Sequence, residues 1–567
     1  MPDLLGPQAA SLAVLRWKYA GPGEGTPADV NRRVARALAG AEAPGQRARW
    51  ATRFERALQA GFIPAGRILA QAGLSPARPL INCYVQPLNP ARGEDHRGQT
   101  TLADALDQTA RTLALGGGVG LDFSALARAQ VLPALHAFEQ VAQTHTNRSR
   151  PGALMGVLHA DHPDLEAFID AKAGGGLTHF NLSVGLSDAF MQRVQAREPE
   201  ASARWQHLVH AAWHHGEPGV LFLDTMNRDD SLAWRETLRA TNPCGEQPLP
   251  AHGSCCLGSI DLSRLVQQPF TTSARFDDAG LCALASTAVR MLDNVIDLTA
   301  WPLAAQRQEA LQTRRIGLGF TGLADALIML GLRYDRAEGR AQATHIARVL
   351  RDSAVRASVD LARERGPYPC FDARKHLAPP GFASRLPAHL QRAIAQHGLR
   401  NSHLLSVAPA GSISLAMADN VASGIEPVWA WQTGRSVRSR DGTAQMLQFK
   451  NHGWRLFHRL RGLHRQRPAG SRTSNEPGAG ALPPAFMTVD QISALRQLAM
   501  AEAVAPCMDA AVSKTVLLPQ DATPALVSRV LRHAWRHGLK GVAVYRPNPV
   551  IAPLIQPVAV CTVTAPR

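Results

Sequence analysis

Short apolar runs alternate with helical patterns along most of this chain. Apolar side chains recur at helical spacing from about residue 28 to Gly61, which is typical of a helical segment ended by glycine. Further along, the pattern predicts strands at 80–85, 155–158, 180–184, 404–407 and 542–545, and helices at 102–115, 162–171, 281–298 and 323–330. This alternation predicts an α/β core with much parallel pairing, preceded by an N-terminal helical cap.

Two segments rich in small residues invite a nucleotide-binding interpretation. Residues 116–123 read as a glycine-rich turn, but they have neither the spacing of a dinucleotide fingerprint nor the Lys-Ser/Thr of a P-loop. Residues 407–414 run from a strand to a helix start, where free backbone N–H groups favour an anion. An ordinary strand-to-helix turn capped by serine is an equally supported alternative.

Length and composition narrow the class of protein. A chain of 567 residues, 45% of them hydrophobic, predicts one large barrel or two to three domains. The start of the chain has no cationic and apolar leader, and no segment reaches the roughly 18 uncharged apolar residues of a membrane helix. Eight cysteines without CxxC pairs favour reduced thiols over a disulfide scaffold or a zinc site. We therefore expect a cytoplasmic protein with no membrane partner and no metal site.

The positive charge is concentrated in one segment. The net charge is +16, and ten Lys and Arg residues lie between Arg435 and Arg472 with the single anion Asp441. A solvated basic face is favoured over a nucleic-acid surface, because charge runs are commonly just exposed. With its Pro and Gly clusters, the segment from about 433 to 485 reads as an insertion or a cover.

The densest candidate chemistry is the run Asn242-Pro243-Cys244-Gly245-Glu246, with Cys255 eleven residues after Cys244. It combines an amide, a thiol and a carboxylate, although Asn-Pro with Gly is also ordinary turn chemistry. Cys83 lies in an early predicted strand. If Cys83 and Cys255 met in space, they could deliver two electrons by forming a disulfide. The sequence leaves open whether they meet.

Five stretches resemble the large subunit of ribonucleotide reductases, most closely the adenosylcobalamin-dependent class II enzymes. The resemblance runs in a consistent order from about residue 60 to 550. It is carried by 64–68 with 82–85, 116–124, 155–158 with 161–164, 242–246 with 255–260, and 409–414 with 423–427. Residues 314–319, 512–515 and 540–546 also match. The adjacent tyrosine pair of class I and the Arg-Gly-Tyr-Gly motif of the glycyl-radical class are both absent from the sequence.

This resemblance implies a ten-stranded α/β barrel of the ribonucleotide reductase and glycyl-radical superfamily, with Cys244 on a central loop shielded from water. It implies reduction of ribonucleoside diphosphates to 2′-deoxyribonucleotides for DNA synthesis, with adenosylcobalamin as the cofactor. Thioredoxin or another thiol would be the reductant, and a homodimer is compatible with the family.

The resemblance also implies residue roles. Cys244 would become the thiyl radical that abstracts the ribose 3′-hydrogen, Glu246 would be the general base, and Asn242 would hydrogen-bond the ribose hydroxyls. Cys83 and Cys255 would supply the reducing electrons. The substrate-binding set would be Asn82, Gly118, Pro409, Ala410, Gly411, Ser412 and Ile413.

Departures from the family pattern keep two alternatives open. The segment between 124 and 155 is short, and Cys561 is a single C-terminal cysteine where the family has a pair. Cys256 makes the partner of Cys83 ambiguous, although spacing favours Cys255. The alternatives are a class I type large subunit that needs a separate radical-generating subunit, and a catalytically impaired nucleotide-binding protein.

Pattern and resemblance together predict five segments along the chain. They are an N-terminal helical region at 1–75, a first barrel part at 76–432, a basic insertion or linker at 433–485, a barrel completion at 486–550 and a C-terminal tail at 551–567.

Overall fold

The computed structural model describes residues 5–88, 101–145, 152–173, 175–465, 482–548 and 555–557. Its N-terminal region is helical, as the sequence predicts. The Thr26 side chain caps the second helix by accepting from the backbone N–H of Asp29, and Gly61 ends the third at φ 118°. The helices are α1 (Ala9–Lys18), α2 (Pro27–Leu38), α3 (Arg47–Ala60) and α4 (Gly66–Gln71).

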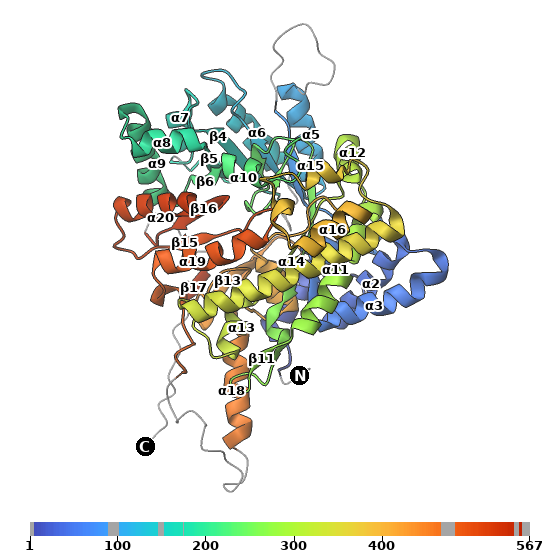
Figure 1. The fold of residues 1–567 in the computed structure, drawn as a ribbon. Coiled ribbons are helices and arrows are strands. Elements are labelled where there is room, and N and C mark those ends of the chain that lie inside the picture. Colours follow the sequence, from blue (N-terminus) through green and yellow to red (C-terminus); the bar gives the residue numbers. More distant parts are fainter. Residues whose placement is uncertain are drawn as a thin grey trace, which may run out of the picture.

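A sheet of ten strands forms the centre of the molecule. Figure 1 shows helices around these strands, with the N-terminal helices α2 and α3 on one side. The strands are β1 (Phe62–Pro64), β2 (Cys83–Gln86), β3 (Gly118–Asp122), β4 (Leu154–His159), β5 (Phe180–Leu186), β6 (Gly219–Phe222), β9 (Ser254–Asp261), β12 (Ile316–Thr321), β15 (Thr515–Leu517) and β16 (Gly541–Tyr545).

The sheet consists of two parallel halves joined antiparallel. Strands β2 to β6 pair in parallel and in sequence order. In the other half, β12 is parallel to β9 and β15 is parallel to β16. The halves meet where β9 runs antiparallel to β2 and where β16 runs antiparallel to β6. Parallel pairing requires crossover connections, which explains the alternation of strands and helices in the sequence.

The ladder of named strands stays open between β12 and β15. Residues 404–407, predicted as a strand, lie in this gap and make only isolated bridges, from Leu405 to Leu318 of β12 and from Val407 to Val512. The Asp509 carboxylate accepts hydrogen bonds from the backbone N–H groups of Leu404 and Leu405. Side-chain acceptors replace part of the ladder here, and the sheet of named strands is not closed at this point.

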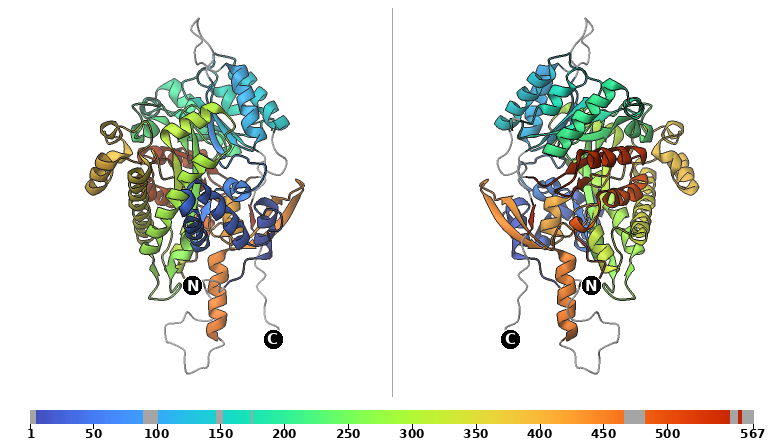
Figure 2. Two further views of the ribbon diagram at one scale, coloured as in Figure 1. Left: turned by 90° about the vertical axis from the view of Figure 1, so that its right-hand side faces the viewer. Right: turned by 90° about the vertical axis from the view of Figure 1, so that its left-hand side faces the viewer.

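Helices cover the outer side of the strands (Figures 1 and 2). They are α5 (Leu102–Ala114), α6 (Val131–His145), α7 (Leu165–Asp170), α8 (Asp188–Gln195), α9 (Pro199–His215), α10 (Leu223–Asp229), α11 (Asp278–Leu298), α12 (Ala304–Thr313), α13 (Leu323–Met329), α14 (Ala337–Arg365), α15 (Ala373–His376), α16 (Ala388–His397), α17 (Gly411–Met417), α19 (Ala494–Val504) and α20 (Pro524–Arg536).

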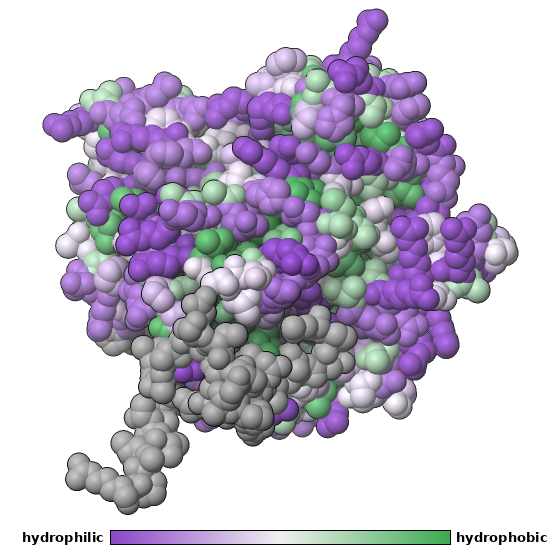
Figure 3. All heavy atoms as spheres, turned by 60° about the horizontal axis from the view of Figure 1, so that its bottom comes forward, coloured by the Kyte–Doolittle hydropathy of each residue, from purple (hydrophilic) through white to green (hydrophobic). Residues whose placement is uncertain are grey.

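Among the described residues, α11 alone is long and apolar enough to cross a membrane by length and composition. Most of it is buried, and it carries Arg290 and Asp293 in ion pairs with Glu42 and Arg314. These features identify α11 as a core helix. On the face shown in Figure 3, hydrophilic residues predominate between small hydrophobic groups.

The basic segment contains a hairpin of β13 (Gln432–Arg438) and β14 (Ala444–Lys450), followed by α18 (His452–Arg465). Helix α18 projects from the body of the molecule in Figure 2. The hairpin contacts the N-terminal region, since Arg440 donates to the carbonyl of Arg16 at 2.9 Å. Arg455 likewise donates to the carbonyl of Gly6 at 3.0 Å.

The prediction of a glycine-rich turn at 116–123 was wrong, because residues 118–122 form β3. A Cβ atom built on Gly120 would lie 1.9 Å from the carbonyl oxygen of Thr241, and one on Gly118 would lie 3.0 Å from Pro243 Cγ. The glycines therefore serve a close approach of two backbones and not a chain reversal.

We expect Gly120→Ala to force this second segment away from β3. Overpacking of this kind costs about 1–3 kcal/mol, so the thermal unfolding midpoint should fall. Gly176→Ala is the control, because nothing lies within 4 Å of a Cβ built there. Equal unfolding midpoints for the two variants would contradict the close approach.

Candidate active site

A loop at residues 240–249, here called the central loop, runs along the inside of the sheet. Its ends are the paired strands β7 (Ala240–Thr241) and β8 (Pro248–Leu249). Strand β7 packs against β2, β3 and β4. The chain reverses at Gly245, which has φ 80° and whose N–H donates to the carbonyl of Asn242 at 3.0 Å. Cys244 therefore stands at the tip of a tight turn.

Segments from both halves of the sheet hold the tip. Asn181 of β5 donates its amide to the carbonyl of Pro243 at 2.9 Å. From the opposite half, the hydroxyl of Ser513 donates to the carbonyl of Cys244 at 2.8 Å. The backbone N–H of Ala511 donates to the carbonyl of Glu246 at 2.9 Å. The loop thus lies between the two halves.

Asn242 and Glu246 are buried next to each other. The Asn242 amide nitrogen donates to Glu246 Oε1 at 2.8 Å and contacts Cys83 Sγ at 3.4 Å. The other carboxylate oxygen, Oε2, is buried without a hydrogen-bond partner. Burial raises the pKa of Glu246 to about 7. A carboxyl group with that pKa can take or give a proton near neutral pH.

The structure brings Cys83 and Cys255 together. They are cross-strand partners at the antiparallel junction of β2 and β9, and both are buried free thiols. Opposed residues in such a pair have Cα atoms about 4.5–5.5 Å apart, which lies within the range for a disulfide. Burial raises the pKa of both thiols well above the usual value, so both keep their protons.

Cys256 faces the other way. Successive strand residues point to opposite faces, and Cys256 belongs to the large outer core whereas Cys83 and Cys255 share an apolar cluster around the central loop. The geometry therefore favours Cys255 over Cys256 as the partner of Cys83.

The Cys244 side chain is exposed, so the expectation of a loop shielded from water holds for its neighbours and not for this sulfur. Desolvation by the surrounding protein, and secondly the charge of Glu246, nevertheless raise the pKa of the thiol. Cys244 is therefore accessible from outside the loop and keeps its S–H proton near neutral pH.

The predicted substrate-binding residues fall into two groups. Half-buried Asn82 accepts the N–H of Gly118 through its carbonyl at 2.8 Å, and Gly118 lies against Pro243 of the central loop. Residues 409–413 form the turn into α17, with Ala410 at φ 53°, and the Ser412 hydroxyl lies 2.7 Å from the hydroxyl of Tyr19. Val407, just before this turn, accepts from the N–H of Ser513 at 3.0 Å. Ser513 thus links the turn to Cys244.

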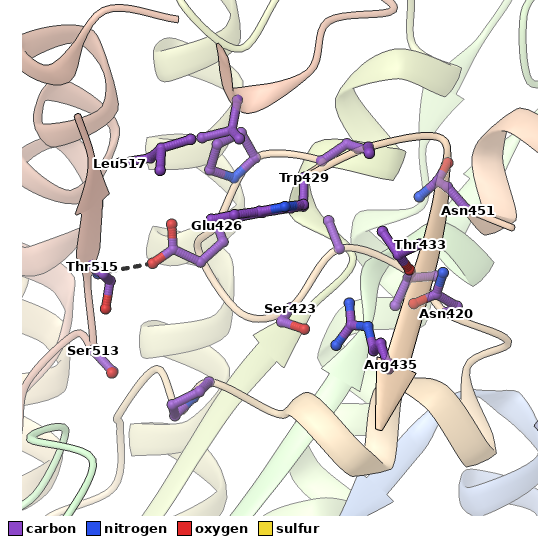
Figure 4. A pocket seen from close by; sticks show the side chains of 17 residues that line it. Asn420, Ser423, Glu426, Trp429, Thr433, Arg435, Asn451, Ser513, Thr515 and Leu517 are labelled. Atoms are coloured by element: carbon purple, nitrogen blue, oxygen red, sulfur yellow. Dashed lines mark hydrogen bonds between the residues drawn. The ribbon is translucent and has the colours of Figure 1, made fainter. Parts of the chain in front are cut away.

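A cavity of about 210 Å³ opens beside this turn (Figure 4). Pro409 and Ser513 lie on its wall, together with Trp429, Thr433 and Arg435. Glu426 also faces it, but the Glu426 carboxylate pairs with Lys514 and accepts the N–H of Thr515 at 2.9 Å. The cavity therefore extends from Pro409, at the start of the predicted substrate turn, to Ser513, which holds the tip of the central loop.

Within the described part of the chain, two groups of side chains have metal-ligand spacing, with ligand atoms within 4.8 Å of one another. They are Asp230, Glu236 and His403 in the interior, and Glu502, His533 and His537 nearer the surface. Arg315 pairs with Glu236 in the first group, and its positive charge opposes a metal ion there. No predicted catalytic residue belongs to either group.

Sequence reasoning assigned no role to three residues around the loop. Ser513 supports the tip, and Arg315 donates to the carbonyl of Pro248 at 3.4 Å. The Gln247 amide is buried with neither side-chain polar atom hydrogen-bonded. The sequence did contain a signal for Ser513 and Arg315, because both lie in stretches that resemble the reductases. Neither of these stretches contains a recognisable chemical motif.

A barrel with thiols on an internal loop and across a strand junction contains the groups that radical or redox chemistry uses. Comparison with known families agrees. The profile "Ribonucleotide reductase, all-alpha domain" matches residues 5–76, and "Ribonucleotide reductase, barrel domain" matches 82–202 and 197–545. The chain belongs to the ribonucleotide reductase large-subunit family.

Relatives and a solved structure lie in the same family. The chain is 35% identical to the vitamin B12-dependent ribonucleoside-diphosphate reductase of Mycobacterium tuberculosis (strain CDC 1551 / Oshkosh), over 96% of this chain and 80% of that one. It is 29% identical to the enzyme of the same name from Thermoplasma acidophilum, over 87% and 65% of the two chains. The class Id ribonucleotide reductase alpha subunit of Actinobacillus ureae matches with TM-score 0.73 and 18% identity, covering 96% of this chain and 98% of that one, which supports the fold.

We expect mild oxidation of the folded chain to link Cys83 to Cys255. The register places the two thiols opposite each other, so mass spectrometry should find their peptides joined and separated again by dithiothreitol. Cys256→Ser is the control and should keep the link, whereas Cys255→Ser should lose it. A Cys83–Cys256 product would show that the register does not govern the pairing.

Proposed function

We propose that this protein reduces ribonucleoside diphosphates to 2′-deoxyribonucleoside diphosphates by thiyl-radical chemistry. The observation that carries the proposal is the arrangement of Asn242, whose amide contacts both Glu246 and Cys83 beneath the loop tip. Hydrogen-atom abstraction, proton transfer and dithiol reduction need these groups around one substrate sugar. The names of the relatives support the same reaction.

Each group has one task in the proposed reaction. Cys244, as a thiyl radical, takes the 3′-hydrogen of the ribose, and Glu246 takes the proton of the 3′-hydroxyl. The 2′-hydroxyl leaves as water with a proton from the thiol pair. The second thiol hydrogen forms the C2′–H bond that replaces C2′–O, and the two thiols Cys83 and Cys255 become one disulfide. Glu246 returns its proton to the 3′ oxygen, and Cys244 returns its hydrogen to C3′, which regenerates the thiyl radical. The raised pKa values of the three thiols keep them in the hydrogen-bearing form.

The names of the relatives indicate a cobalamin, and we propose adenosylcobalamin as the cofactor. When bound, it supplies a carbon-centred radical by cleavage of its cobalt–carbon bond. The wall beside the loop tip fits a polar ligand, because Arg435 Nε and Thr433 Oγ1 are buried there without hydrogen-bond partners. These two residues would hold polar groups of a ligand, while Ser513 fixes the position of Cys244.

The remaining assignments rest on the family. A dithiol such as thioredoxin would reduce the Cys83–Cys255 disulfide, and we propose a cytoplasmic enzyme. Cys561, the single C-terminal cysteine, lies outside the described residues. The five-segment division and the role of the 409–413 turn in binding the diphosphate stay proposals.

The pH dependence of kcat/KM should follow the ionisation of Glu246. Because burial raises its pKa to about 7, the carboxylate that accepts a proton forms as the pH rises through 7. We therefore expect kcat/KM to increase about tenfold per pH unit below pH 7 and to level above it. In the Glu246→Gln variant, this rise of kcat/KM with pH should disappear, and the rate should fall by a factor of about 10²–10⁴. A rise that persists in the variant would assign the titration to another group.

The decisive assay uses ribonucleoside diphosphate, adenosylcobalamin and dithiothreitol without a second protein. We expect deoxynucleotide formation by the wild-type chain and none by Cys244→Ser, because the hydroxyl O–H bond is too strong for the hydrogen exchange. Nucleotide affinity should be unchanged in this variant. Turnover only after addition of a separate radical-generating subunit would favour the class I alternative, and turnover by Cys244→Ser would exclude the thiyl mechanism.

A further inference from the structure

Arg435, the first cation of the basic segment, turns into the cavity. Alternate residues of β13 share a face, and Thr433 lies on the same side of the strand as Arg435. Both line the cavity, and Figure 4 shows the guanidinium directed from β13 toward the side where Ser423 lies. By contrast, Arg438, three residues further along, is exposed. Arg435 thus differs from the solvated basic residues that the charge pattern suggests.

The Arg435 guanidinium has no hydrogen bond or ion pair within the described part of the chain, and its Nε is buried. Desolvation lowers its pKa to about 10, so it remains charged at neutral pH. The acid on the same wall, Glu426, is already paired with Lys514. Arg435 as a whole is half-buried, but its Nε is buried and its charge has no partner, so the cavity favours an anion.

A second hydrogen-bond donor without a partner also favours an anion in this cavity. Thr433 Oγ1 is buried without a hydrogen-bond partner. The two amides on this wall already have acceptors, because Asn451 donates to Asp325 at 2.8 Å and Asn420 donates to the carbonyl of Lys450 at 3.2 Å. A guanidinium and a hydroxyl on one strand face can both donate to the oxygens of one tetrahedral anion.

We propose that Arg435 and Thr433 bind a phosphate group of a ligand that lies against the loop tip. This inference rests on the proposed function, which offers two sources of such a group: the diphosphate of the ribonucleotide and the phosphodiester of the cobalamin nucleotide tail. The cavity reaches both Pro409, at the start of the predicted substrate turn, and Ser513, which supports Cys244. The planar fork of arginine matches phosphate oxygens better than a point charge does.

Equilibrium binding to the full chain tests the proposal without turnover. Calorimetric titrations with a nucleoside diphosphate and, separately, with hydroxocobalamin would compare the wild type with Arg435→Gln. A hydrogen bond to a charged group is worth about 1.5–3 kcal/mol, so we expect affinity for one of the two ligands to fall about tenfold to a hundredfold. Arg438→Gln, an exposed arginine of the same strand, is the matched control and should bind both ligands as the wild type does.

The two titrations identify the source of the phosphate. Weaker binding of the nucleotide alone assigns Arg435 to the substrate, and weaker binding of the cobalamin alone assigns it to the cofactor. Thr433→Val keeps the charge and should weaken the same ligand by a smaller factor, which keeps the test valid if Arg435→Gln folds poorly. Wild-type affinity of Arg435→Gln and Thr433→Val for both ligands would overturn the proposal. These outcomes do not depend on deoxynucleotide formation, so a failure of the proposed reaction is seen separately in the turnover assay.

Discussion

The close contact between the central loop and β3 is the constraint on which the site depends. A strand normally projects a side chain at every second position into the interior, but Gly118 and Gly120 leave that space to Pro243 and the carbonyl of Thr241. The loop can therefore lie against the sheet, and donors from β5 and from residues 511–513 fix its tip. Two halves of the barrel thus position one sulfur.

The antiparallel junction of the two halves places the other two thiols. In a fully parallel barrel, β2 and β9 would not oppose Cys83 and Cys255 in this register. Strand alternation then separates Cys255, inside the barrel, from Cys256, in the outer core. The same burial that packs these residues raises the pKa of their thiols and of Glu246, so packing and chemistry have one physical cause.

The peripheral elements also contribute to the interior. Tyr19 of the N-terminal region meets Ser412 beside the α17 turn, and Arg440 of the β13–β14 hairpin meets the backbone of α1. The hairpin supplies part of the cavity wall through Thr433 and Arg435. A segment that reads as a basic insertion is therefore part of the architecture around the proposed active site.

The sequence alone determined the alternation of strands and helices, the helical N-terminus ended at Gly61, and the candidate residues 242–246, because hydrophobic period and residue chemistry are local properties. It misread 118–122 as a turn, since the reason for those glycines is a loop more than 100 residues away in the chain. Whether Cys83 meets Cys255, which face Cys256 takes, and that Arg435 points inward were decided only by tertiary structure. Register, strand direction and burial are set by packing between distant segments, and no local pattern contains them.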